Sequence, residues 1–123
     1  MIRILVVEDD ELTRRFIETA MGGPDRVIQT VGDGHAALKL LSQKGFDVLV
    51  TDIYHPGPSG LRLISRIRSN PKLKHLRIMV VSGHARGEKV QAAKECGADD
   101  VRAKPFDPQK FRKDFEQLMV RAA

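Results

Sequence analysis

The chain has 123 residues, of which 41% are hydrophobic and 30% are charged, and this balance is typical of one soluble globular domain. No apolar stretch approaches the roughly 20 residues of a membrane-spanning helix, and no signal-peptide pattern precedes the first apolar run, so we expect a cytoplasmic protein. The net charge of +5 comes from Lys and Arg spread through several segments, so we expect solvated helix faces first and an acidic protein partner second. Nucleic acid is the least favoured partner, because aromatic residues make up only 5% and offer no stacking platform.

Five strand-like runs alternate with five segments of helical spacing. The strands are expected near residues 3–7, 26–31, 47–51, 77–82 and 99–103, which are rich in Val, Ile and Leu and apolar on both faces. Apolar residues at helical spacing mark the helices, in chain order Leu12, Phe16, Ile17 and Ala20; Ala36, Ala37, Leu40 and Leu41; Leu61, Leu63, Ile64 and Ile67; Val90, Ala93 and Cys96; Phe111, Phe115, Leu118 and Met119. The first four helices are expected to end at Gly22, at Gly45, before Pro71 and at Gly97.

Strict alternation of strand and helix predicts a doubly wound α/β fold. Right-handed crossovers leave few topologies, and we favour a flavodoxin-like (βα)5 arrangement with a five-stranded parallel sheet in the order 2-1-3-4-5. No linker, repeat or low-complexity segment appears, so residues 1–123 are expected to form a single domain without an output domain. The single cysteine, Cys96, is expected to be a small hydrophobe, since no activating base is evident near it.

Reactive side chains follow four of the five apolar runs. Parallel strands bring their carboxyl ends to one edge of the sheet, where open α/β folds place their sites. The residues at these ends are Glu8, Asp9 and Asp10; Asp52; Ser82; and Lys104. Several carboxylates, one hydroxyl and one ammonium suit a divalent cation and a phosphoryl group.

The acidic residues suggest metal binding and nucleophilic chemistry. Glu8 and Asp9 are expected to hold Mg²⁺, with Mn²⁺ as a second candidate, while Asp10 caps the following helix. An ionised Asp52 could attack phosphorus, form an aspartyl phosphate and share the metal, with the backbone carbonyl of Tyr54 as a further ligand. Each of these acids has the alternative role of a helix cap or turn residue.

Ser82 and Lys104 complete the predicted site. The Ser82 hydroxyl would donate a hydrogen bond to a phosphoryl oxygen once Asp52 is modified. A cis bond between Lys104 and Pro105 would turn the lysine inward, to pair with Asp52 when it is free and with phosphate when it is loaded. The alternatives are an ordinary strand-end hydroxyl and a surface lysine.

The chain resembles a response-regulator receiver domain over essentially its whole length. The matching pieces are residues 4–10, 33–34, 52–53, 56, 60, 80–83, 97–100 and 104–106. The resemblance implies Mg²⁺-dependent phosphotransfer to Asp52 from a sensor histidine kinase or histidine phosphotransferase, with slow autodephosphorylation. It also implies that Asp9 is the direct metal ligand, that Ser82 is the hydroxyl switch, and that the peptide bond after Lys104 is cis.

The chain departs from the family pattern at one position. Receivers often carry an aromatic residue three positions before the motif lysine, and this chain has Val101 there. We therefore expect the output surface, formed by the fourth helix, fifth strand and fifth helix, to switch by backbone and loop shifts, or only weakly. Tyr54 and His84 lie two positions beyond Asp52 and Ser82, where the resemblance implies that they tune hydrolysis of the phosphoryl group.

Two surfaces are expected to bind partners. Arg14, Arg15 and Phe16 on the first helix match the place where receivers dock their kinase or phosphotransferase. A second set of cations could make the output surface basic, namely Arg86, Lys89, Arg102, Lys110 and Lys113. We expect a monomer or a weak dimer.

Other protein classes fit less well. A pseudo-receiver, folded alike but used as an unphosphorylated scaffold, stays the alternative. A flavodoxin-like cofactor protein would need a phosphate-cradling loop where residues 8–11 are acidic, and a dinucleotide-binding enzyme would need the absent G-x-G-x-x-G pattern. A haloacid-dehalogenase-like phosphatase would need a second aspartate where this chain has Tyr54.

Overall fold

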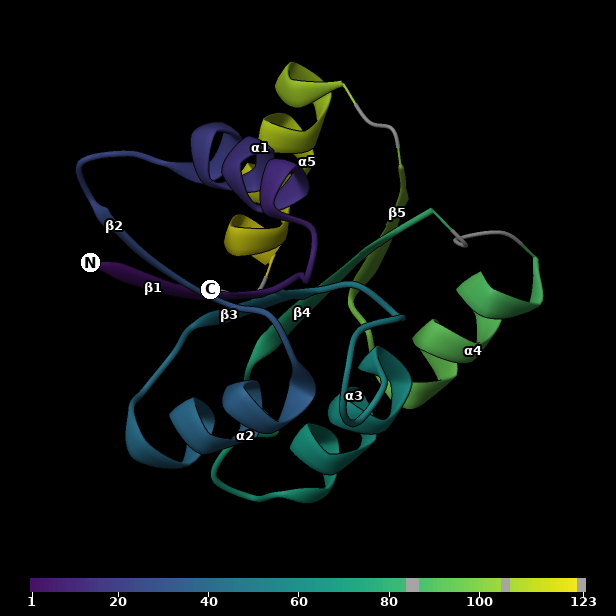
Figure 1. The fold of residues 1–123 in the computed structure, drawn as a ribbon. Helices are drawn as coiled ribbons and strands as arrows, with labels where there is room; N and C mark the ends of the chain where they lie inside the picture. Colours follow the sequence, from purple (N-terminus) through teal and green to yellow (C-terminus); the bar gives the residue numbers. More distant parts are fainter. Residues whose placement is uncertain (84–86, 105–106, 122–123) are drawn as a thin grey trace.

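A computed structural model describes residues 1–83, 87–104 and 107–121 of the chain. Five strands alternate with five helices in these ranges (Figure 1). The elements are β1 (Ile2–Val7), α1 (Glu11–Met21), β2 (Arg26–Val31), α2 (Gly34–Gln43), β3 (Val48–Thr51), α3 (Gly60–Ser69), β4 (Arg77–Ser82), α4 (Glu88–Cys96), β5 (Asp100–Ala103) and α5 (Pro108–Arg121). The expectations for His84 and for the bond between Lys104 and Pro105 fall outside the described residues.

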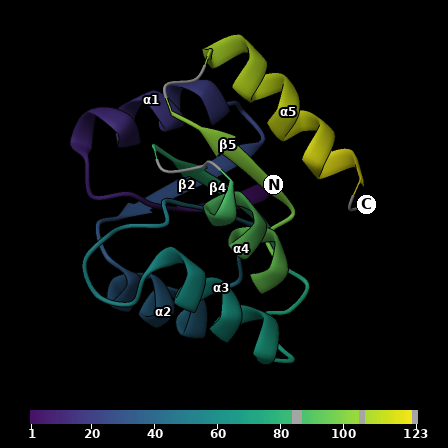
Figure 2. The same ribbon diagram turned by 90° about the vertical axis from the view of Figure 1, so that its right-hand side faces the viewer.

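The sheet is wholly parallel and has the predicted strand order, β2-β1-β3-β4-β5. Helices α1 and α5 cover one face, and α2, α3 and α4 cover the other (Figures 1 and 2). The doubly wound fold expected from the alternation of strands and helices is therefore confirmed. No helix in the described ranges is long and apolar enough to cross a membrane.

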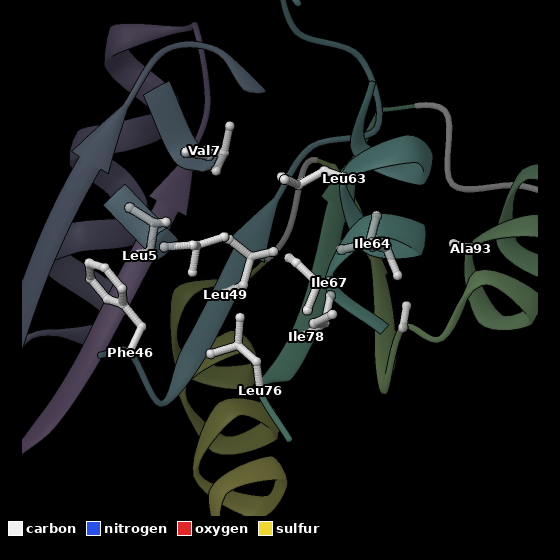
Figure 3. Close-up of a cluster of buried hydrophobic side chains, with 14 of the residues drawn as sticks. Leu5, Val7, Phe46, Leu49, Leu63, Ile64, Ile67, Leu76, Ile78 and Ala93 are labelled. Atoms are coloured by element: carbon white, nitrogen blue, oxygen red, sulfur yellow. The ribbon is translucent and has the colours of Figure 1, made fainter. Parts of the chain in front are cut away.

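Each face of the sheet has its own hydrophobic core, because successive side chains of a strand point to opposite faces. Ile4 and Val6 point toward α1 and α5, where they meet the buried rings of Phe111 and Phe115. Leu5 and Val7 point the other way, into the cluster that Figure 3 shows under α2, α3 and α4. The central strands are apolar on both faces for this reason.

Two details of the helices differ from the sequence-based expectations. Leu12 is 77% exposed, whereas α1 buries Ile17, Ala20 and Met21. Leu12 precedes Ile17 by five residues, which places it roughly 140° around the helix from the buried stripe. Helix α2 ends at Gln43 and is capped by Lys44 in an extended conformation, whose N–H donates to the Leu40 carbonyl, so the cap lies one residue before the expected Gly45.

Gly60 lets the start of α3 lie directly against the strand end that carries Asp52. Its N–H donates to the Ile53 carbonyl at 2.7 Å. A Cβ atom at Gly60 would come within 2.2 Å of the Asp52 backbone oxygen and 2.8 Å of the Ile53 Cα atom. The close approach of helix to strand therefore requires a residue without a side chain at this position.

We predict that Gly60→Ala lowers the free energy of unfolding by about 1–3 kcal/mol, because the new methyl group must push backbone atoms apart. Urea denaturation followed by circular dichroism measures this change. Gly45→Ala is the matched control, since no atom lies within 4 Å of a Cβ placed there. Equal stability of the two variants would show that α3 does not need the close approach.

Candidate functional site

The carboxyl ends of β1, β3, β4 and β5 meet at one edge of the sheet. The backbone continues the sheet pairing one residue beyond the strands, since Asp52 N–H donates to the Val7 carbonyl at 3.2 Å and Lys104 N–H donates to the Ser82 carbonyl at 3.0 Å. Glu8, Asp52, Ser82 and Lys104 are thus brought together by the register of the strands.

The Lys104 ammonium lies between two carboxylates. Its Nζ atom is 2.7 Å from Oε2 of Glu8 and 2.8 Å from Oδ2 of Asp52. Glu8 is 2% exposed, Asp52 is 9% exposed, and the lysine side chain is 20% exposed. The two buried carboxylates can lie close together because the Lys104 ammonium forms an ion pair with each of them.

The same arrangement shifts the acidities of all three groups. Burial alone would raise the pKa of Asp52, but the Lys104 ammonium, with hydrogen bonds from Ser82 and from the Tyr54 N–H, holds this pKa below its ordinary value. Burial raises the pKa of the more deeply buried Glu8, and Lys104 offsets only part of that rise. Burial would lower the pKa of Lys104, but its bonds to Asp52 and Glu8 raise it, so the ammonium stays charged.

The three acids after β1 take three different positions. Glu8 is buried, Asp9 is exposed, and Asp10 caps α1 as expected, accepting from the Thr13 N–H at 2.9 Å. This cap lowers the pKa of Asp10. Within the described ranges no three carboxylate, histidine or cysteine groups gather closely enough to form a ready metal cage.

The donor atoms at the edge nevertheless suit a hard cation. Glu8, Asp9 and Asp52 offer only carboxylate oxygens, which Mg²⁺ prefers. The second oxygen of Asp52, Oδ1, accepts a hydrogen bond of 3.3 Å from the Tyr54 N–H. The carboxylates of Glu8, Asp9 and Asp52, all at or next to strand ends of this edge, fit a site completed by a metal ion and water.

Tyr54 lies two residues after Asp52 and contacts α4. Its side chain is 45% exposed, and the Lys89 Nζ atom lies 5.4 Å from the centre of its ring. A hydrogen bond to Tyr54 raises the pKa of Lys89. This link between the loop after Asp52 and the first turn of α4 was not foreseen from the sequence, because it joins two residues that are far apart in the chain.

Two further contacts near the site were also missed. The pairing of Lys104 with Glu8 was not predicted, since the sequence suggested Glu8 only as a metal ligand. The buried Thr51 hydroxyl lies 3.1 Å from Nε2 of His55, which ties the end of β3 to the loop that follows Asp52. Val101 is half-buried and packs against the core under α2, α3 and α4.

The predicted partner surfaces are partly neutralised. On α1, Arg15 pairs with Glu11, and both side chains are exposed. On the output surface, Arg102 pairs with both Asp100 and Asp114. The expectation that Arg102 adds positive charge to that surface is therefore wrong, because two neighbouring carboxylates balance it.

Comparisons with known proteins agree on one family. A family model described as the response regulator receiver domain matches residues 4–116. Chemotaxis protein CheY of Pseudomonas aeruginosa is 31% identical over 122 residues, covering 98% of this chain and 98% of that protein.

Solved structures show the same fold. The chemotaxis response regulator CheY4 of Vibrio cholerae has a TM-score of 0.88 at 25% identity, covering 96% of this chain and 98% of that chain. The receiver domain of sensor histidine kinase PA1611 from Pseudomonas aeruginosa, solved with magnesium in its active site cleft, has a TM-score of 0.85 at 21% identity, covering 96% and 97%.

We predict that Lys104→Met lowers the free energy of unfolding at about pH 7 by roughly 2–4 kcal/mol, because two buried carboxylates lose their shared cation. In the variant, burial and mutual repulsion raise both carboxyl pKa values, so acid stabilises it. In the wild type, the contribution of Asp52 is present above its ordinary pKa of 3.8 and is lost as the pH falls through its lowered folded value. The difference in stability should therefore shrink toward about pH 4.5.

Urea denaturation at both pH values tests this expectation. Lys113→Met is the control, since Lys113 is exposed on α5 and forms no ion pair in the described part of the chain. A stability difference for Lys104→Met that stays constant with pH would argue against the shared-cation account.

Proposed function

Because the chain belongs to the response regulator receiver domain family, we propose that it is a phosphoacceptor switch in which Asp52 receives a phosphoryl group from a phosphohistidine. The donor is a sensor histidine kinase or a histidine phosphotransferase. One observation carries the proposal: the Asp52 carboxylate is buried at the sheet edge, 2.8 Å from the Lys104 ammonium and hydrogen-bonded by Ser82.

The transfer follows from the chemistry of these groups. An oxygen of the ionised Asp52 carboxylate attacks phosphorus, a P–O bond forms, and the P–N bond to the donor imidazole breaks. The electron pair of that bond goes to the imidazole nitrogen, which then takes a proton. The lowered pKa of Asp52 keeps the nucleophile ionised. Lys104 and Ser82 then donate to oxygens of the new phosphoryl group.

The proposed cofactor is Mg²⁺, or Mn²⁺ in its place. Glu8, Asp9, Asp52 and the backbone carbonyl of Tyr54 would hold it, as their oxygen donors suggest. When bound, the ion offsets the negative charge of the phosphoryl oxygens. A magnesium ion in the cleft of the receiver domain of PA1611, which has the same fold, supports this assignment.

We place the downstream protein target on the surface formed by α4, β5 and α5. In receivers with an aromatic residue at the position of Val101, the ring swings inward as the hydroxyl moves. This chain has Val101 on β5, so movement of the Ser82 hydroxyl cannot be coupled to a ring there. The contact between Tyr54 and Lys89 offers another route, because it connects the loop after Asp52 with α4. The alternative is an unphosphorylated scaffold, whose partners would bind equally well whatever the state of Asp52.

Phosphorylation by acetyl phosphate tests the proposal. Wild type should give a shifted, Mg²⁺-dependent band on a phosphate-affinity gel, because the charge of the phosphoryl group requires the metal. The band should disappear in EDTA and in Asp52→Asn, which removes the nucleophile. Folding of the variant is checked by circular dichroism.

The absence of any band in folded wild type, with metal titration showing no binding, would favour the scaffold. If Mg²⁺ binds but no band forms, the protein should be presented with phosphorylated kinase or phosphotransferase, and failure there would overturn the proposal. A band that persists in Asp52→Asn would place the phosphoryl group elsewhere.

Tyr54 is proposed to shield the aspartyl phosphate from water. We predict that Tyr54→Ala shortens the lifetime of the phosphorylated protein severalfold in Mg²⁺, because removal of the ring opens the mouth of the site. The decay of the shifted band after removal of acetyl phosphate measures this lifetime. Lys89→Ala removes the contact of Lys89 with Tyr54 but keeps the Tyr54 ring, so it should shorten the lifetime less. An unchanged decay rate in Tyr54→Ala would count against shielding.

A further inference from the structure

Helix α3 and the turn after it carry charge of only one sign. Between Asp52 and Glu88 the chain has no Asp or Glu. The cations in this stretch are Arg62, Arg66, Arg68, Lys72, Lys74, Arg77 and Arg86. Helices α1, α4 and α5 each contain acids as well as bases, so the segregation of charge is a property of α3 and not of the whole surface.

Four of these cations are exposed and have no carboxylate partner in the part of the chain that the structure describes. Arg62, Arg66, Lys72 and Lys74 are exposed, and in the described part of the chain none has a carboxylate oxygen within 4.0 Å. Arg68 differs, because it turns inward to donate to backbone carbonyls and to pair with Asp99. Arg68 therefore stabilises the fold, whereas Arg62, Arg66, Lys72 and Lys74 remain available to contact a partner.

The neighbouring helix extends the same surface. Helix α2 lies beside α3 on the same face of the sheet (Figures 1 and 2), and the two helices are in contact. Lys39 and Lys44 are exposed there, and residues 34–46 contain no Asp or Glu. A partner that covers α3 and reaches α2 would therefore meet positive charge on both helices.

Arg62 stands against the local preferences of its helix. Ser59 caps α3 and accepts from the Arg62 N–H at 3.3 Å. A Glu or Gln at the third residue after such a cap would complete a capping box, and this chain has Arg62 there. A cation there also faces the positive end of the helix dipole, and Arg66 one turn later adds like-charge repulsion. The charge of Arg62 therefore does not stabilise the start of the helix, which favours a role for it in binding.

The chemistry of the surface points to carboxylates. Ser65, Arg66, Ser69, Asn70 and Pro71 line a shallow depression of about 500 Å³. A guanidinium with hydroxyl and amide donors beside it matches a carboxylate well. The large apolar residues exposed in the described ranges, Met1, Leu12, Val27 and Tyr54, all lie outside α3, so the surface offers charge and not an apolar anchor.

Other anionic partners fit this face less well. Helix α3 is flanked by α2 and α4 in one layer, so it does not protrude to enter a nucleic-acid groove (Figure 2). It exposes no Phe, Tyr or Trp for base stacking. Its apolar residues Leu63, Ile64 and Ile67 are buried against the sheet, so it cannot insert into a membrane as an amphipathic helix.

We propose that the exposed face of α3 and the following turn, residues 62–75, is a docking surface for an acidic polypeptide segment of a partner protein. This surface lies apart from the proposed output surface on α4, β5 and α5. Binding there needs no phosphoryl group, so it does not rest on the proposed function of Asp52.

The test measures binding of a dye-labelled oligoglutamate peptide to the full chain by fluorescence anisotropy, with backbone amide shifts in NMR to locate it. We expect Arg62→Glu with Arg66→Glu to weaken binding by about tenfold or more, because two attractive charges become repulsive. The largest amide shifts in the wild type should fall in residues 62–75. Circular dichroism should show that the variant stays folded, since Arg62→Glu completes the capping box of Ser59 and offsets the acid that Arg66→Glu places in the last turn of α3.

The matched comparison is Lys110→Glu with Lys113→Glu on α5, which changes the net charge by the same amount at two exposed positions. These lysines belong to the proposed output surface, so this pair also tests whether the peptide binds there instead. It should alter the affinity less than about twofold. Equal weakening in both double variants would overturn the proposal, because the peptide would then sense only net charge. Tighter binding of duplex DNA or of phosphatidylglycerol vesicles through the same residues would also overturn it and reassign the surface.

Discussion

The Lys104 ammonium sits between Glu8 and Asp52 at hydrogen-bond distance from both. Without a cation, two carboxylates buried this closely would repel each other, and one would take up a proton. With it, Asp52 keeps a lowered pKa and stays ionised, although it is almost inaccessible to water. Both the ionised state of Asp52, the proposed nucleophile, and the stability of its buried carboxylate thus depend on one lysine that lies 52 residues further along the chain.

The parallel sheet makes this meeting possible. Each crossover helix returns the chain to the same end of the sheet, so every strand delivers its last side chain to one edge. The register of the strands then aligns these side chains with one another, since Asp52 pairs with Val7 and Lys104 pairs with Ser82 one residue beyond the strands. Two separate cores hold the sheet between its helical layers, and Gly60 lets α3 begin directly behind Asp52.

The two helical layers have different surfaces. On one side, α1 and α5 mix acids and bases, and Arg102 near them is neutralised by two carboxylates. On the other side, α4 also mixes acids and bases, but α2 and α3 contain no acid, and Arg62 and Arg66 have no carboxylate partner among the described residues. Tyr54 and Lys89 join this second layer to the site, where the family pattern would use an aromatic residue at the position of Val101. A receiver that lacks the usual ring therefore still has a physical contact between its site and α4.

The sequence by itself determined the fold, the strand ends and the helix cap at Asp10, because apolar periodicity and capping are local and are set by neighbouring residues. It also placed Glu8, Asp52, Ser82 and Lys104 at one edge, since topology follows from alternation. Only the tertiary structure decided that Lys104 pairs with Glu8 as well as Asp52, that Leu12 faces solvent, and that Lys89 meets Tyr54. These outcomes depend on packing between residues distant in the chain, and no local pattern specifies which distant side chain fills a given position.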